Sequence, residues 1–291
     1  MPTLEDTPPS GTALSAPRPR RGRRLALVAL ALAVVAGGVA IAVTRIGGPS
    51  AAPGCTATVA SRSYPLELAQ AANAATIAAV GKRNGVEDHG VTVALAAALQ
   101  ESRLHNLPNG DLDSVGLFQQ RPSQGWGPAS QLVVPSYAAS AFYRALVQIP
   151  GWPSLPVTEA AQRVQRSAAP DAYAFWEPEA RDLAQVLTGE VPSGLTCQFS
   201  TPTKTSGSST LTDAMATELG SPALGATVTP ARGWTVASWL VAYAYTYRIT
   251  AVSFAGMRWT PSSAKWASTP PVQQQVQLTQ AGPAGAGSSS S

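Results

Sequence analysis

One glutamate and a glycine-containing turn that follows it are the residues whose types and spacing could do chemistry. Glu101 and Ser102 end a stretch rich in alanine, and a Gly-Leu-Phe-Gln run occupies residues 116–119. A carboxylic acid that stays protonated can donate a proton to a departing oxygen, and burial favours the neutral form. Gly116 permits close approach of the backbone, and the Gln119 amide can donate and accept hydrogen bonds. The set predicts a proton donor beside a groove for a polar ligand.

Helical periodicity places the glutamate at the end of a helix. A helix is predicted over residues 90–103, and Ala94, Ala97, Ala98 and Glu101 recur on one of its faces. The helix dipole disfavours an acid in the last turn, so this position favours a functional role for Glu101. The other interpretation is an exposed carboxylate at a helix end, as most glutamates are.

The motifs as a set resemble a known family. Glu101-Ser102, the run at 116–119, Pro122 and Asp-Ala-Tyr at 171–173 occur in the order found in lysozyme-like soluble lytic transglycosylases. The resemblance covers residues 66 to about 189. It implies a lysozyme-like domain that cleaves peptidoglycan glycan strands between N-acetylmuramic acid and N-acetylglucosamine. Glu101 would be the general acid and base, and the reaction would need neither a metal nor a cofactor.

The resemblance also implies roles for residues around Glu101. Ser102 would hold Glu101 or the substrate's acetamido group, and Gly116 and Gln119 would contact the sugar. The Tyr173 hydroxyl would donate a hydrogen bond to Glu101, although Ala174 stands where the family has asparagine.

Several aromatic and apolar residues have two interpretations. Leu117 and Phe118 either line the groove and contact substrate or belong to the core. Trp126 and Trp152 are candidate platforms for sugar stacking, while a buried core position is the commoner place for tryptophan.

A second carboxylate would decide the mechanism. Asp111 and Asp113 follow Glu101, and Asp113 is expected to contact substrate. In a hydrolytic muramidase one of them would assist water or the cationic sugar. The transglycosylase resemblance implies that the substrate's acetamido group and O6 replace that acid. Asp is also common in turns, so the turn and catalytic interpretations both stay open.

Composition limits the classes of partner. Charged residues make up 12% and apolar residues 45% of the chain, which is enough apolar content for a core. The net charge is +4, and five arginines at positions 18, 20, 21, 23 and 24 account for it. The remainder is close to neutral, so no nucleic-acid partner is predicted.

An apolar run near the amino end predicts a membrane anchor. Residues 25–44 contain no charge, and at about 1.5 Å per residue they can cross a hydrocarbon core of roughly 30 Å. Arginines before the run place residues 1–24 in the cytoplasm and the catalytic domain outside, in a single-pass membrane protein. A cleaved signal peptide and a lipoprotein signal at Cys55 are the alternatives, and the long distance from the apolar run argues against the second.

Cys55 and Cys197 are the only cysteines. They flank the expected catalytic domain on the predicted exterior side, which predicts a disulfide between them. A Cys-His hydrolase is the rival, but His89 and His105 are the only candidate bases. Two histidines also argue against a zinc site.

The expected fold is mainly α, with a lysozyme-like helical domain after one transmembrane helix and a small α/β module at the end. No strand is predicted before residue 190. Helices are predicted over residues 66–83, 90–103, 135–147, 158–167 and 178–187. The segments are a disordered tail (1–24), the transmembrane helix (25–44), a linker (45–64), the catalytic domain (65–199), a linker (200–209), the small module (210–280) and a disordered tail (281–291).

The small module shows a helix over 235–247, a hairpin over 249–260 and a further strand over 272–278. Trp239, Tyr243 and Tyr247 form a helical stripe that fits either a buried core or a surface for an unknown protein partner. The sequence thus predicts a membrane-anchored lytic transglycosylase. A hydrolytic muramidase and a non-catalytic peptidoglycan-binding or scaffold protein are the alternatives.

Overall fold

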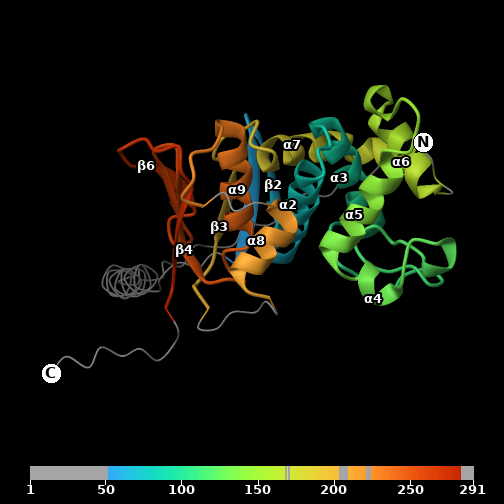
Figure 1. Cartoon of the computed structure of the whole chain (residues 1–291), viewed down its shortest axis with the longest axis horizontal. Coiled ribbons are helices and arrows are strands. Elements are labelled where there is room, and N and C mark those ends of the chain that lie inside the picture. Colours follow the sequence, from blue (N-terminus) through green and yellow to red (C-terminus); the bar gives the residue numbers. More distant parts are fainter. Residues whose placement is uncertain (1–51, 168, 170, 203–208, 221–223, 283–291) are drawn as a thin grey trace, which may run out of the picture. The chain divides into compact units, whose positions relative to one another are not determined.

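The computed structural model describes residues 52–167, 169, 171–202, 209–220 and 224–282 (Figure 1). These residues belong to one compact unit, Ala51–Ser291. The described part holds eight α-helices, three short 3-10 helices and seven strands. Its α-helices are α2 (Leu68–Arg83), α3 (Asp88–Ser102), α4 (Ala129–Leu132), α5 (Pro135–Leu146), α6 (Val157–Gln165), α7 (Glu177–Leu187), α8 (Leu211–Leu219) and α9 (Pro230–Ala242). Its 3-10 helices are η1 (Pro122–Gln124), η2 (Trp152–Ser154) and η3 (Ala172–Trp176).

A three-stranded antiparallel sheet corrects the expected fold class. Its strands β1 (Gly54–Val59), β2 (Arg62–Leu66) and β3 (Leu195–Gln198) lie in the order β2-β1-β3. A second antiparallel sheet of four strands follows later in the chain. The prediction of a mainly α fold without strands before residue 190 is therefore wrong, and the described chain combines helices with two sheets.

The β1–β2 hairpin escaped prediction because its residues are small and polar. Only Cys55 and Ala57 of β1 are buried, so the alternation of buried and exposed residues is too short to be recognised in the sequence. Pro65, expected in the first turn of a helix, instead pairs with Thr56 in the edge strand β2. A proline is tolerated on an edge strand because its missing N–H faces away from the partner strand.

The membrane-spanning helix expected over residues 25–44 lies outside the described residues. Within the described ranges, no helix is both long and apolar enough to cross a bilayer. The fold is accordingly that of a mixed α and β unit, and the transmembrane helix is not one of its described elements.

The predicted disulfide is confirmed. Cys55 and Cys197 are bonded across 142 positions of sequence, and they are direct partners in the antiparallel pairing of β1 with β3. The bond therefore joins the first described strand to the strand that follows α7.

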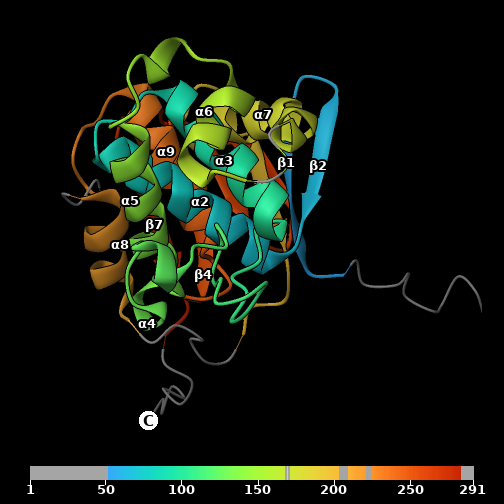
Figure 2. The same cartoon turned by 90° about the vertical axis from the view of Figure 1, so that its right-hand side faces the viewer.

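Alanine-rich helices form the centre of the unit. Figure 2 shows α2 and α3 among the other helices, and every residue of α3 from Gly90 to Leu99 is buried. Small side chains let neighbouring helices approach closely, so α3 contacts α5, α6 and α7 along its length. The predicted helices at α2, α3, α5, α6 and α7 are present with bounds shifted by one or two residues.

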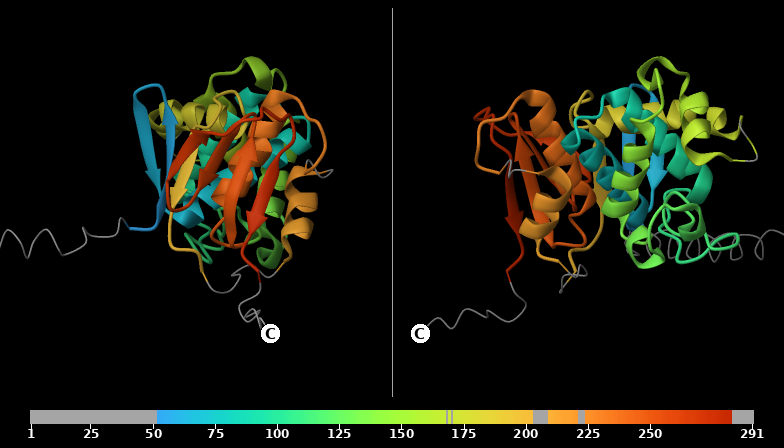
Figure 3. Two further views of the ribbon diagram at one scale, coloured as in Figure 1. Left: turned by 90° about the vertical axis from the view of Figure 1, so that its left-hand side faces the viewer. Right: turned by 45° about the vertical axis from the view of Figure 1, so that its right-hand side comes forward.

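The second sheet carries α9 on one side (Figure 3). Its strands, in the order β6-β5-β4-β7, are β4 (Ile249–Phe254), β5 (Met257–Thr260), β6 (Lys265–Ser268) and β7 (Gln277–Gln280). The predicted β4–β5 hairpin is present. The aromatic stripe is core: Trp239 and Tyr247 are buried, and the rings of Trp239 and Tyr243 stack 4.4 Å apart.

The carboxy-terminal elements pack directly on the helical part. Thr235 Oγ1 of α9 donates to the Thr188 carbonyl at 2.8 Å, and Trp266 Nε1 of β6 donates to the Leu195 carbonyl at 2.9 Å. Buried residues of both parts belong to one continuous hydrophobic core. The two parts therefore stabilise each other.

A buried carboxyl lies where α2, α8 and α9 meet. Glu218 is 8% exposed and accepts hydrogen bonds from Thr76 Oγ1 at 2.9 Å, Trp239 Nε1 at 2.7 Å and the Tyr243 hydroxyl at 3.3 Å. Burial raises the pKa of Glu218 above its ordinary value, and the three donors offset only part of that rise.

This raised pKa predicts a pH dependence of stability. A carboxyl whose pKa is higher in the folded than in the unfolded state stabilises the fold below the unfolded value of about 4.3, and loses that contribution as the pH rises. The free energies of unfolding of wild type and of the Glu218→Gln variant can be measured in denaturant at a series of pH values. As the pH rises above about 4.3, the free energy of unfolding of the variant should increase relative to that of wild type. A difference between the two proteins that stays constant with pH would contradict the assignment.

Candidate functional site

Glu101 is fixed by the way α3 ends. Arg103 and Leu104 both adopt left-handed backbone conformations, with φ of 53° and 62°. Their N–H groups donate to the Leu99 and Ala98 carbonyls, which closes the last turn of the helix. Leu104 is fully buried and anchors the chain after the turn. Glu101 therefore lies in the last turn of a rigid helix, as predicted, and is partly exposed.

Tyr173 holds the Glu101 carboxylate. The Tyr173 hydroxyl donates to Glu101 Oε1 at 2.7 Å, which is the hydrogen bond implied by the family resemblance. Tyr173 belongs to η3 and is fully buried. Burial, and then the charge of Glu101, raise the pKa of Tyr173 well above its ordinary value. The phenol therefore stays protonated and remains a donor to Glu101.

Ser102 ties the end of α3 to the Gly-Leu-Phe-Gln turn. Its Oγ lies 2.7 Å from the Leu117 carbonyl oxygen and 3.1 Å from the Ala98 carbonyl oxygen. Ser102 is buried, so its hydroxyl positions the backbone next to Glu101. The Gly-Leu-Phe-Gln turn and the end of α3 that carries Glu101 are thereby held in a fixed relative position.

Gly116 makes the turn possible. Its φ is +78°, and a Cβ at this position would lie 2.3 Å from the Leu132 carbonyl oxygen. Its N–H donates to the Leu107 carbonyl at 2.7 Å. No other residue type combines this left-handed conformation with such a close approach of backbone.

Leu117 and Phe118 are core residues. Both are fully buried, and the Phe118 ring stacks on Phe142 of α5 with centroids 4.8 Å apart. Of the two interpretations that the sequence left open, the structure favours the core over the groove lining. Their carbonyl groups, rather than their side chains, face the surrounding site residues.

Gln119 uses its amide within the turn. Its Oε1 accepts from Ser114 Oγ at 2.9 Å, and its Nε2 donates to the Gly116 carbonyl at 3.1 Å. The side chain is half-buried, and both ends of its amide are already hydrogen-bonded within the turn.

Asp113 is occupied by partners of its own loop. Its carboxylate accepts from Arg121 Nε at 2.8 Å and from the N–H and Oγ of Ser123 at 2.7 and 2.9 Å. The Arg121 guanidinium, followed by the Ser123 N–H, lowers the pKa of Asp113 to about 2. Asp111 is exposed, and its carbonyl accepts from the Ser114 N–H in a turn. The geometry thus favours the turn interpretation for both residues.

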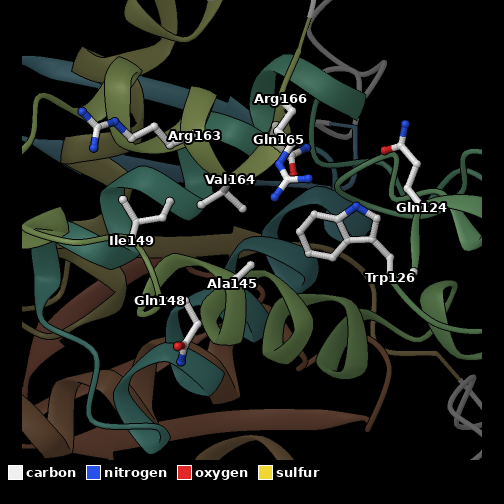
Figure 4. A pocket seen from close by; sticks show the side chains of 10 residues that line it. Gln124, Trp126, Ala145, Gln148, Ile149, Arg163, Val164, Gln165 and Arg166 are labelled. Carbon is white, nitrogen blue, oxygen red and sulfur yellow. The ribbon is translucent and has the colours of Figure 1, made fainter.

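A cavity of about 650 Å³ lies beside the turn, between η1, α5 and α6 (Figure 4). Trp126 lines this cavity. Gln165, also in its lining, donates through Nε2 to the Phe118 carbonyl at 2.8 Å. Ser102, the residue after Glu101, donates to the carbonyl of Leu117, which precedes Phe118 in the same turn. The cavity lining and the end of α3 are therefore both hydrogen-bonded to the Gly-Leu-Phe-Gln turn. Trp152, the other candidate platform, stacks near His89 with ring centroids 6.4 Å apart.

Aromatic and cationic residues near Glu101 were not predicted. Trp176 Nε1 donates to Gln100 Oε1 at 2.9 Å, and the Arg103 guanidinium lies 3.9 Å above the Trp176 ring. Phe175 is 75% exposed and meets Trp176 edge to face. The run Phe175-Trp176, which begins two residues after Tyr173, was a signal in the sequence that could have indicated these aromatic neighbours.

No group of three or more His, Cys, Asp or Glu side chains in the described ranges could hold a metal ion. No protein-family model matches the chain, and no curated protein matches it either. The chemical interpretation of the site therefore depends on its geometry and on the motifs.

Proposed function

We propose that the chain is a peptidoglycan lytic transglycosylase with Glu101 as general acid and base. The observation that carries the proposal is the Glu101 carboxyl, held by the Tyr173 hydroxyl at 2.7 Å in the last turn of α3. The hydrogen bond of Ser102 to Leu117 fixes the neighbouring turn relative to this acid. A carboxyl held in a fixed position is what glycosidic cleavage requires of its general acid.

The proposed reaction has two proton transfers at one residue. Protonated Glu101 donates its proton to the glycosidic oxygen while the bond from that oxygen to C1 breaks. The carbonyl oxygen of the substrate's 2-acetamido group bonds to C1. Glu101, now a carboxylate, accepts the proton of the muramyl O6 hydroxyl as O6 bonds to C1 and displaces the acetamido oxygen. The product is a 1,6-anhydro sugar, and Glu101 is again protonated.

The hydrogen bonds that the Asp113 carboxylate already accepts favour cyclisation over hydrolysis. A hydrolytic muramidase uses a second carboxylate to support a water or the cationic sugar. Asp113 already accepts three hydrogen bonds from Arg121 and Ser123, so its carboxylate is poorly placed to leave them for a substrate. A reaction assisted by the substrate's own groups needs no such acid.

The Cys55–Cys197 disulfide supports a location outside the cytoplasm, because structural disulfides persist mainly in oxidising compartments. Peptidoglycan is found in such a compartment, so substrate and enzyme would meet there.

Digestion of purified peptidoglycan by the full chain, with the released muropeptides identified by mass, tests the proposal. Products ending in anhydromuramic acid support it. Products with a reducing muramic acid would identify a hydrolytic muramidase instead. Binding without release would leave the glycan-binding protein as the better interpretation.

Tyr173→Phe is expected to lower kcat by roughly 10- to 100-fold with little change in KM, because a hydrogen bond to a charged group is removed. Steady-state kinetics on soluble glycan fragments measure both constants. Tyr245→Phe provides the control, since Tyr245 packs on Phe199, with ring centroids 5.4 Å apart, in another part of the fold. Equal kinetics for Tyr173→Phe and wild type would exclude a positioning role for the phenol.

A further inference from the structure

The described residues that line the cavity beside the motif turn carry positive charge and no negative charge. Among the described residues of its lining, two are arginines, Arg163 and Arg166, and none is Asp or Glu. Gln124, Gln148 and Gln165 add amide groups that can donate hydrogen bonds. A surface of this composition favours a ligand that carries negative charge.

The two arginines differ in what they contact. Arg163 donates to Glu159 one turn earlier on α6, so its charge is partly balanced. For the Arg166 side chain, no ion pair or hydrogen bond with another described residue exists. Arg166 ends α6 in a left-handed conformation with φ of 53°, and its side chain is exposed. Among the described residues, none therefore competes with a ligand for its guanidinium.

Trp126 provides the aromatic part of the same cavity. Figure 4 shows Trp126, Gln165 and Arg166 on one side of the cavity and Arg163 on the other. Trp126 is half-buried, so its ring is held by the fold and still accessible. An aromatic ring beside a free guanidinium suits a sugar that carries a carboxylate, since the ring packs on the sugar face and the guanidinium binds a carboxylate through two parallel hydrogen bonds.

The cavity is connected to the acid through backbone. Gln165, the residue before Arg166, donates to the Phe118 carbonyl, and Ser102, the residue after Glu101, donates to the Leu117 carbonyl. The lining of the cavity and the end of α3 that carries Glu101 are therefore both hydrogen-bonded to the motif turn.

Resting on the proposed function, we propose that Arg166 and Trp126 form a specificity site for the carboxylate-bearing substituent of a muramyl residue. The carboxylate comes either from the lactyl group of an unsubstituted muramic acid or from a peptide attached to it. The site distinguishes muramyl-containing strands from neutral glycans such as chitin, whose sugars carry no carboxylate.

Binding to the full chain in its Glu101→Gln form tests this site without cleavage. Tryptophan fluorescence would be titrated with a chitin oligosaccharide, with peptide-free glycan strands and with peptide-bearing strands of equal sugar number. Carboxylated strands should bind more tightly than chitin. Arg166→Gln should reduce the ratio of the two affinities about tenfold, the size expected for one charged hydrogen-bonded pair. Arg144→Gln, which removes the same charge from α5 outside the lining, should keep the preference.

The arms of the titration separate the two sources of carboxylate. Preference for peptide-free strands assigns the lactyl group, and preference for peptide-bearing strands alone assigns the peptide. An Arg166→Gln variant that keeps the full preference, or that loses chitin binding equally, would overturn the proposal. Because binding is measured in an inactive variant, a wild-type enzyme that releases no anhydro product would refute the proposed reaction while leaving this result intact.

Discussion

Glu101→Gln is expected to lower the turnover of peptidoglycan by about 10²- to 10⁴-fold, the range that general acid–base catalysis contributes. The amide has the shape of the carboxyl, and its oxygen can still accept from the Tyr173 hydroxyl. The amide has no proton to give to the glycosidic oxygen and cannot accept one from O6. The fold should therefore be retained while both proton transfers are lost. The rate of release of anhydro-muropeptides measures the effect.

Two comparisons make this result specific. Thermal unfolding of Glu101→Gln should match wild type, which excludes loss of structure as the cause. Glu177→Gln removes a carboxyl of α7 that is paired with Arg181 at 2.7 Å, and it should leave turnover unchanged. If Glu101→Gln retained more than about a tenth of wild-type turnover, well outside the range for a general acid, Glu101 would not be the proton donor.

Gly116→Ala is expected to destabilise the protein by about 2 to 5 kcal/mol. An alanine is strained at the left-handed φ of +78°. Its Cβ would also lie 2.3 Å from the Leu132 carbonyl oxygen, so the backbone must move. That movement would shift the Leu117 carbonyl and, through Ser102, the end of α3. Unfolding in denaturant should show the loss, and turnover should fall with it.

Gly125→Ala separates the clash from the conformational cost. Gly125 has a φ of +83°, but nothing lies within 4 Å of a Cβ placed there. This variant should lose only about 1 to 2 kcal/mol, the cost of the left-handed conformation itself. Equal losses for the two variants would show that the approach of Leu132 is unimportant.

Local sequence patterns predicted α2, α3, α5, α6 and α7 to within two residues, whereas α4 and α8 were not predicted and α9 begins and ends five residues earlier than the predicted helix over 235–247. The bounds of α2, α3 and α5 follow from apolar residues at helical spacing and from proline near the start of α5, which are properties of a few neighbouring residues. The same holds for the β4–β5 hairpin, where Ala255-Gly256 gives the turn between two apolar runs. Glu101 could be placed in a last turn for this reason.

The amino-terminal sheet could not be predicted in this way. Its central strand β1 pairs on one side with a strand that begins more than a hundred positions later, and Cys55 meets Cys197 only through that pairing. Short strands of small polar residues carry almost no periodic signal. The disulfide was predictable because there were only two cysteines to pair.

Side-chain partners in the site were the least predictable part. The sequence indicated which residues of the motif turn mattered, but not that Leu117 and Phe118 would be buried or that Gln119 would bond within its own turn. These outcomes depend on α5 and on the loop around Ser114, which are folded against the motif by tertiary contacts. The link between Gln165 and Phe118 has no signal in the sequence at all.

The covalent link between β1 and β3 also determines how mechanical load passes through the molecule. Glu101, the motif turn and Tyr173 all lie in the chain between Cys55 and Cys197. Along the covalent chain, tension between the residues before Cys55 and the residues after Cys197 passes through the sulfur atoms and not through the enclosed loop. A single cut in that loop would likewise leave both pieces attached. The covalent path between the two ends of the chain thus bypasses the segment that carries the site.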